Sequence, residues 1–156
     1  MSKGKQVEYD SRADTLKHIG RVGYYMQKLI HELLKREGLH DKTKLESPEK
    51  ELFDLFTPKL KKLTYGSEEY KKCLEGLGEA LKHHYENNSH HPEHYEDGIN
   101  GMCLVDILEM VCDWKAAGER QEDGNILESL KINIRRYNID PQLARLLENT
   151  IYKYSR

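Results

Sequence analysis

The sequence predicts an all-α protein, a single helical domain of about six helices over residues 1–156. Three observations predict this fold class. Apolar residues recur at spacings of three and four in several segments, and no segment alternates convincingly with period two. Helix-starting residues precede several of these segments. The length is a common one for one domain, and we expect residues 1–10 to form a flexible N-terminus.

The first predicted helix covers residues 11–37 and ends at Gly38. Its apolar residues recur at helical spacing and are Leu16, Ile19, Val22, Met26, Leu29, Ile30 and Leu33. His18 shares a face with Val22 and Leu29, so we expect this histidine at the edge of the apolar stripe.

A short connection with His40 and Asp41 leads to the second predicted helix, from 47 to about 63. Its Ser-Pro-Glu start places proline in the first turn, where helices accept it, and we expect the pair 57–58 (Thr-Pro) to interrupt the helix. A third helix should run from a Ser67 cap to His84. Two glycines, at 76 and 78, either weaken this helix or allow close packing.

Residues 89–101 are polar, with one proline and two glycines, and predict a loop. Residues 102–117 are apolar nearly all round, which is typical of a central buried helix. This helix nevertheless carries three carboxylates on one face, Asp106, Glu109 and Asp113. Buried carboxylates are costly unless they are paired or bind a cation. Two further helices are predicted over about 125–137 and 141–154, the second capped by Asp140.

Charge and hydropathy exclude several classes of function. The chain has 25 basic and 27 acidic residues, and no segment concentrates one sign, so we do not expect duplex nucleic acid as a partner. No run approaches the roughly 18 apolar residues of a membrane span, and the N-terminal residues lack the apolar centre of a signal peptide. We therefore expect a cytoplasmic protein that does not bind membranes.

The placement of histidines and acids predicts a metal site. Imidazole and carboxylate ligands together suit manganese, iron, cobalt, nickel or zinc. Taken singly, the His40-Asp41 pair also fits an ordinary turn, the adjacent 83–84 histidines a helix end, and the 90–91 pair a solvated loop. Glu109 is either a partner of a basic residue or a carboxylate that orients a histidine ligand.

These residues together resemble the HD-domain superfamily of metal-dependent phosphohydrolases. The superfamily has a lone histidine on the first helix, a His-Asp pair, further histidines and a late aspartate. Residues 39–49, LHDKTKLESPE, resemble its His-Asp-x-x-Lys element, with Lys44 in the lysine position. Residues 111–117, VCDWKAA, resemble the segment with its last metal ligand, which implies that Asp113 is a ligand and Asp106 is not.

Two further resemblances concern the loop. Residues 90–98, HHPEHYEDG, resemble an element of the branch that cleaves cyclic dinucleotides, but the Gly-Tyr-Pro that should follow is absent. Residues 12–155 resemble a small uncharacterised family of phages and bacteria, with His-x-x-Asn-x-x-His-His-Pro-Glu followed by Glu-Met-x-x-Asp-Trp. That pattern favours His84 over His83 as a ligand, and a phage-encoded chain would act in the host cytoplasm.

The resemblance to the HD-domain superfamily implies a phosphohydrolase that cleaves a nucleotide or another small phosphate ester through a metal-activated hydroxide. One or two divalent metal ions would be held by His18, His40, Asp41, His84, His90, His91 and Asp113. Catalysis would depend on Asp41, Lys44 and Glu109, and substrate binding on Lys44, Asn87 and Glu93. The expected partner is a small-molecule phosphate or nucleotide, and the chain is a possible homo-oligomer.

Two other functions use the same residues. Some members of the superfamily with additional histidines hold two irons and oxidise their substrate with dioxygen, so a di-iron oxygenase is one alternative. The other is a non-catalytic phage protein that binds or sequesters a nucleotide.

Overall fold

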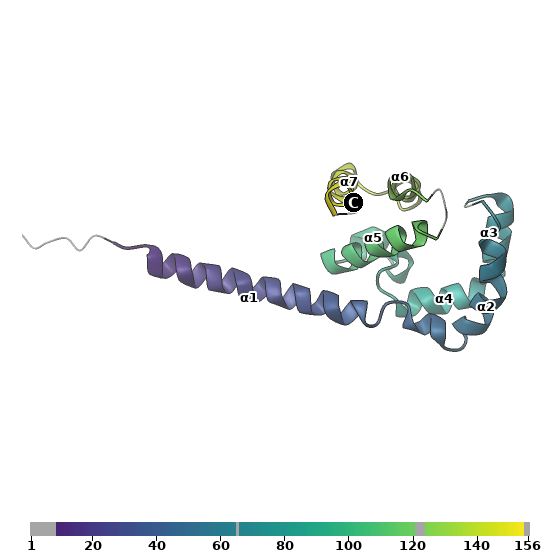
Figure 1. The fold of residues 1–156 in the computed structure, drawn as a ribbon, viewed down its shortest axis with the longest axis horizontal. Coiled ribbons are helices and arrows are strands. Elements are labelled where there is room, and N and C mark those ends of the chain that lie inside the picture. Colours follow the sequence, from purple (N-terminus) through teal and green to yellow (C-terminus); the bar gives the residue numbers. More distant parts are fainter. Residues whose placement is uncertain (1–8, 65, 121–123, 155–156) are drawn as a thin grey trace, which may run out of the picture. The chain divides into compact units, whose positions relative to one another are not determined.

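The computed structural model describes residues 9–64, 66–120 and 124–154, and these residues form helices and no strand (Figure 1). The all-α prediction is confirmed. The chain divides into two compact units, the first ending at Gly38 and the second spanning Leu39–Arg156. The prediction of one domain therefore stays a prediction, and most of the predicted flexible N-terminus, residues 1–8, lies outside the described residues.

The first unit is helix α1, Arg12–Glu37, which matches the predicted helix closely. Gly38 follows it as the C-cap, and its amide donates to the carbonyl of Leu34. No residue of α1 is buried. Apolar side chains of the predicted stripe, including those of Leu16 and Met26, are exposed, and so is His18.

In the second unit, a short 3-10 helix η1, Lys42–Leu45, precedes α2, Glu49–Leu60. The predicted interruption at Thr57-Pro58 is wrong, because α2 continues through Pro58. This proline lies in the last turn, where it removes one amide donor while the Lys61 amide still reaches the carbonyl of Thr57.

The third predicted helix is instead two helices, α3 over Glu68–Glu75 and α4 over Gly78–Asn87. Ser67 caps α3 as predicted, since its side chain accepts from the Tyr70 amide. Gly76 separates the helices and packs on the Phe56 ring of α2, where a Cβ atom would lie 2.4 Å from the ring. The close packing that was one of two interpretations of the glycines is therefore present, at Gly76.

The apolar core of this unit lies between α5, Leu104–Gly118, α6, Ile126–Arg136, and α7, Pro141–Tyr154. Figure 1 shows these three helices grouped together, apart from α2, α3 and α4. Asp140 caps α7 by accepting from the Gln142 amide, as predicted. The buried cluster contains Ile107, Met110, Val111, Leu130, Ile139, Ala144, Leu147 and Ile151.

The predicted loop after α4 contains two short 3-10 helices, η2 over Pro92–His94 and η3 over Gly98–Gly101. It connects the group formed by α2, α3 and α4 to α5. This connection allows side chains from η1, α4, the loop and α5 to lie close together. Among the described helices, none is both long enough and apolar enough to cross a lipid bilayer.

We predict that Leu130→Ala lowers the free energy of unfolding by about 2–5 kcal/mol, because Leu130 is 1% exposed and truncation leaves a cavity between α5, α6 and α7. Urea unfolding measures this. Leu127 of the same helix is 39% exposed, so Leu127→Ala should cost less than about 1 kcal/mol. Equal losses for the two variants would contradict this description of the core.

Candidate metal centre

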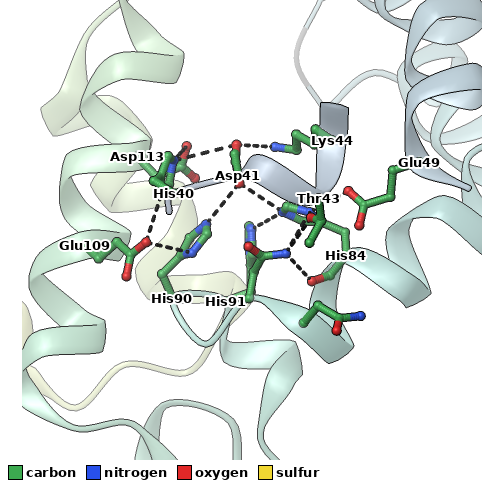
Figure 2. Close-up of polar contacts among 12 residues, drawn as sticks. His40, Asp41, Thr43, Lys44, Glu49, His84, His90, His91, Glu109 and Asp113 are labelled. Atoms are coloured by element: carbon green, nitrogen blue, oxygen red, sulfur yellow. Dashed lines mark hydrogen bonds and ion pairs between the residues drawn. The ribbon is translucent and has the colours of Figure 1, made fainter. Parts of the chain in front are cut away.

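Four segments of the second unit bring acids and histidines together (Figure 2). His40 and Asp41 lie directly before η1. His84 lies in the last turn of α4, followed by His90 and His91 in the loop. Glu109 and Asp113 lie about one turn apart on α5, so their side chains share a face of that helix.

The backbone at Asp41 helps two neighbouring side chains to reach the same site. Asp41 has a φ of 55° and a ψ of 15°, a left-handed conformation that aspartate adopts more readily than most residues. The chain bends sharply at this residue before η1. His40 Nε2 consequently lies 3.6 Å from Asp41 Oδ2, so both side chains belong to one cluster.

The first group of possible ligands contains one carboxylate and three imidazoles, from Asp41, His84, His90 and His91, with ligand atoms within 4.8 Å of one another. Asp41 Oδ1 lies 3.2 Å from His84 Nε2 and 3.6 Å from His90 Nε2. His84 Nε2 lies 2.9 Å from His91 Nε2. Tetrahedral ligands about 2.1 Å from an ion are about 3.4 Å apart, so these distances suit a single cation.

A second group shares Asp41 with the first and contains His40, Asp41 and Asp113. His40 Nε2 lies 3.6 Å from Asp41 Oδ2 and 3.8 Å from Asp113 Oδ1. Each oxygen of the Asp41 carboxylate thus faces a different group, as Figure 2 shows. A carboxylate in this position is able to bridge two cations.

Two polar atoms of the first group support a fit to a cation. Asp41 Oδ1 and His90 Nε2 are both buried and make no hydrogen bond. A buried polar atom without a partner usually costs free energy, so such an atom calls for an explanation. Both atoms are good ligands for a first-row divalent ion, and a bound cation would satisfy them together.

Glu109 lies behind two of the histidines. Its Oε1 is 2.9 Å from His40 Nδ1 and 3.3 Å from His90 Nδ1. In both imidazoles the other nitrogen, Nε2, faces Asp41. The contact required for the predicted orienting role is therefore present. These three residues also form a third possible ligand group, but the hydrogen-bonding distance at His40 favours orientation.

Three polar residues around His84 were not predicted from the sequence as site residues. Glu49, at the start of α2, is 0% exposed, and its Oε2 lies 2.9 Å from His84 Nδ1. Thr43 Oγ1 lies 3.2 Å from the same nitrogen, and the Asn88 amide donates to Thr43 Oγ1. In the sequence, Glu49 is recognisable only as a residue of the predicted helix start. Glutamates are common at the start of surface helices, so this position did not indicate a site residue.

Burial and neighbouring charges shift the pKa values of Asp41, Asp113 and His40. The nearby Asp113 carboxylate, assisted by Glu109, raises the pKa of His40 to about 9 against the lowering effect of burial. Burial alone raises the pKa of Asp41, but the neighbouring His84 ring and the Lys44 ammonium hold it well below its usual range. The nearby His40 ring likewise lowers the pKa of Asp113 against the raising effect of burial.

The two loop histidines shift in the opposite direction from His40. Burial lowers the pKa of His90. Burial and the neighbouring imidazoles His90 and His84 lower the pKa of His91 to about 3. Both rings are therefore neutral at physiological pH, which is the form that binds metals.

Lys44 lies at the edge of the cluster, where it contacts both the acid and an aromatic ring. Its Nζ is 2.6 Å from Asp41 Oδ2 and 5.4 Å from the centre of the Phe53 ring. The Lys44 side chain is 29% exposed, so its ammonium is accessible to a small anion beside Asp41.

Two other predicted site residues of the second unit, Asn87 and Glu93, lie outside this cluster. Asn87 is exposed and donates to the carbonyl of His83. Glu93 accepts from Arg136 and from the Tyr137 hydroxyl. His18 is an exposed residue of α1 in the first unit. The roles of Asn87 and Glu93 in substrate binding, and that of His18 as a ligand, stay predictions.

Asp106 belongs to none of the ligand groups and makes structural hydrogen bonds instead. Its carboxylate accepts from the Ser89 hydroxyl, the Tyr95 hydroxyl and the Cys103 amide. The last contact belongs to the capping of α5. Through these hydrogen bonds Asp106 links the loop to the start of the helix that contains Glu109 and Asp113.

Comparison with known proteins identifies a family without assigning an activity. Residues 7–153 match the model of a family of unknown function, DUF5662, and the chain belongs to this family. Neither the curated proteins nor the solved structures contain a match to the chain. The relation to the HD-domain superfamily therefore stays a prediction.

We predict that metal-free protein loses stability as the pH rises from 6.5 to 9, through His40. Its pKa in the folded state is raised to about 9 from an ordinary 6.5, so the folded state holds a proton that the unfolded chain releases. The stabilisation is complete below pH 6.5 and disappears as the pH passes 9. Urea unfolding with a chelator present measures it, and the His40→Asn variant should show a shallower decline. Parallel pH profiles for the two proteins would contradict the prediction.

Proposed function

We propose that the protein is a metal-dependent phosphohydrolase that acts on a nucleotide or another small phosphate ester. One observation carries the proposal. The buried atoms Asp41 Oδ1 and His90 Nε2, which make no hydrogen bond, lie in a partly buried group of a carboxylate and three imidazoles, spaced as the ligands of one divalent ion are spaced. The second group, on the other oxygen of Asp41, adds room for a second ion.

A divalent cation bound here would supply a Lewis acid and would lower the pKa of a coordinated water. The protein's own residues would then have distinct tasks. Asp41 would supply one carboxylate oxygen to each ligand group, and Asp113 would complete the group that contains His40. Glu109 would keep the Nε2 atoms of two imidazoles directed at the site.

Lys44 is the residue best suited to bind the phosphate. An ammonium group acts as a point charge towards phosphate oxygens. Its position 2.6 Å from Asp41 Oδ2 places this charge beside the ligand that both groups share. A phosphate oxygen that displaced Asp41 from Lys44 would keep the ammonium paired, so substrate binding would not leave an isolated charge.

The same donor set also suits iron, which supports the di-iron oxygenase as the second candidate function. Oxygen uptake by iron-loaded protein, absorption bands in the visible range and retention of activity without oxygen distinguish the two reactions. Hydrolysis with manganese under anaerobic conditions by a colourless protein would exclude the oxygenase.

We predict that protein purified without added metal contains one or two equivalents of a first-row divalent ion, and that Asp41→Asn removes both the ion and phosphatase activity. Asparagine tolerates the left-handed backbone at this position, so helical content should be unchanged. Because even indirect support of a ligand is worth 10–100-fold, loss of this shared ligand should cost more than about 100-fold in turnover. Elemental analysis and a panel of nucleotides and phosphate esters, tested with manganese, iron, cobalt, nickel and zinc, measure both effects.

A surface carboxylate provides the control. Asp54 on α2 is 65% exposed and pairs with Lys50, so Asp54→Asn should retain both ion and activity. An Asp41→Asn protein that hydrolysed the panel as the parent does would refute the proposal. A nucleotide that binds tightly and is recovered intact after denaturation would instead support sequestration.

A further inference from the structure

Glu49 combines full burial with complete use of both carboxylate oxygens. Its Oε1 lies 2.8 Å from His83 Nδ1, and its Oε2 lies 2.9 Å from His84 Nδ1. Glu49 begins α2, where the helix dipole favours a negative charge. Burial of a carboxylate costs free energy unless charged or hydrogen-bonding groups surround it. The two imidazoles and the start of α2 therefore compensate for the burial of Glu49.

The two histidines that Glu49 contacts have different surroundings. The side chain of His83 is 38% exposed, whereas that of His84 is 1% exposed. His84 Nε2 faces Asp41 Oδ1 at 3.2 Å and His91 Nε2 at 2.9 Å. Glu49 therefore links a histidine at the surface to a histidine of the first ligand group.

The contact at His84 Nδ1 determines which nitrogen of the ring is available to an ion. A neutral imidazole carries one proton, and a carboxylate at Nδ1 favours that proton on Nδ1. The lone pair is then on Nε2, which faces Asp41. Thr43 and Asn88 lie around the same nitrogen and restrict rotation of the ring, but both are neutral. In the metal-free protein the Asp41 carboxylate, 3.2 Å from Nε2, competes for the ring proton, and the shorter 2.9 Å contact to Glu49 is the charged contact that favours Nδ1.

We propose that Glu49 is a positioning residue for the metal centre, which accepts a hydrogen bond from His84 Nδ1 and so presents Nε2 of that ring to the cation. The inference rests on the proposed function, because it needs an ion at the first ligand group. Glu49 contacts neither His40 nor Asp113, so its influence is confined to the group of Asp41, His84, His90 and His91. Glu109 has the corresponding position behind His40 and His90.

The first experiment compares the affinities of the parent protein and of Glu49→Gln for zinc or cobalt, measured by competition with a chelator. Glutamine preserves the volume but removes the charge that holds the Nδ1 proton. Such orienting partners are typically worth 10–100-fold in affinity, and we expect a loss of about that size. The cobalt spectrum should change as well, because the geometry of the ligand at His84 changes.

His83 provides the matched control, because it contacts the same carboxylate from the surface side. His83→Gln keeps a donor near Glu49 Oε1 and leaves the contact to His84 intact, so zinc affinity should remain that of the parent. Glu49→Asp keeps the charge on a shorter side chain, and we expect an affinity between those of the parent and Glu49→Gln. Circular dichroism and thermal unfolding with a chelator present show whether each variant folds.

The second experiment tests the inference on the parent protein, whether or not a variant folds. Long-range proton–nitrogen NMR spectra of the metal-free parent reveal the tautomer of His84. We expect the proton on Nδ1, and in Glu49→Gln a shift of population towards the tautomer protonated on Nε2. A parent His84 protonated on Nε2 with a bare Nδ1 would overturn the inference, even if the glutamine variant did not fold.

The outcomes separate this inference from the proposed function. A parent protein that binds ions, together with a folded Glu49→Gln that binds them equally well, would overturn the role of Glu49 and leave the metal centre in place. A parent that binds none of the divalent ions would overturn both. An equal loss in His83→Gln and Glu49→Gln would indicate a structural effect of this contact and would also overturn the inference.

Discussion

The arrangement of the site depends on one partly buried carboxylate, that of Asp41, which two groups of possible ligands share. Neither ligand group is complete without it, because each uses one of its oxygens. A carboxylate oxygen that is removed from water is costly without charged or hydrogen-bonding partners. Lys44 pairs with one oxygen of Asp41, whereas the other, Oδ1, is buried and makes no hydrogen bond. This oxygen is a good ligand for a divalent cation.

The acids around the histidines fall into two sets that contact different ring nitrogens. In His40, His84 and His90, the Nε2 atom faces an aspartate and the Nδ1 atom faces a glutamate. The longer glutamates reach the rings from behind, from α2 and α5, whereas the aspartates share the space where the Nε2 atoms meet. The three rings thus share one orientation relative to the aspartates and the glutamates. Ion pairs that formed independently at a surface would not be expected to share it.

The sequence predicted most of the fold because local signals define most of its helices. Ser67 and Asp140 are caps that act within one turn, and both have the predicted contacts. The break between α3 and α4 was not predictable, since it coincides with the packing of Gly76 on Phe56, a residue 20 positions earlier in the chain. The interruption predicted at Pro58 is wrong because that proline lies in the last turn of α2.

The site was predictable where histidines and acids stand in distinctive pairs, as at 40–41 and 90–91. Glu49 was missed because a glutamate at the start of a helix is ordinary. Only the packing of α2 against α4 makes it fully buried beside His84. Asn88 was missed in favour of its neighbour Asn87, because the resemblance to a family pattern fixes the position in the sequence and not the direction of a side chain.

The charge of the cluster limits how a phosphate could bind. The site contains four carboxylates, on Glu49, Asp41, Glu109 and Asp113, against the ammonium of Lys44 and the proton that His40 carries below its raised pKa. This excess of negative charge repels an anion, and the near-neutral chain as a whole does not compensate. A first divalent ion that displaced the His40 proton would still leave the cluster negative, whereas a second would make it positive. The proposed binding of a phosphate ester would therefore be favoured by occupation of both ligand groups, which share Asp41.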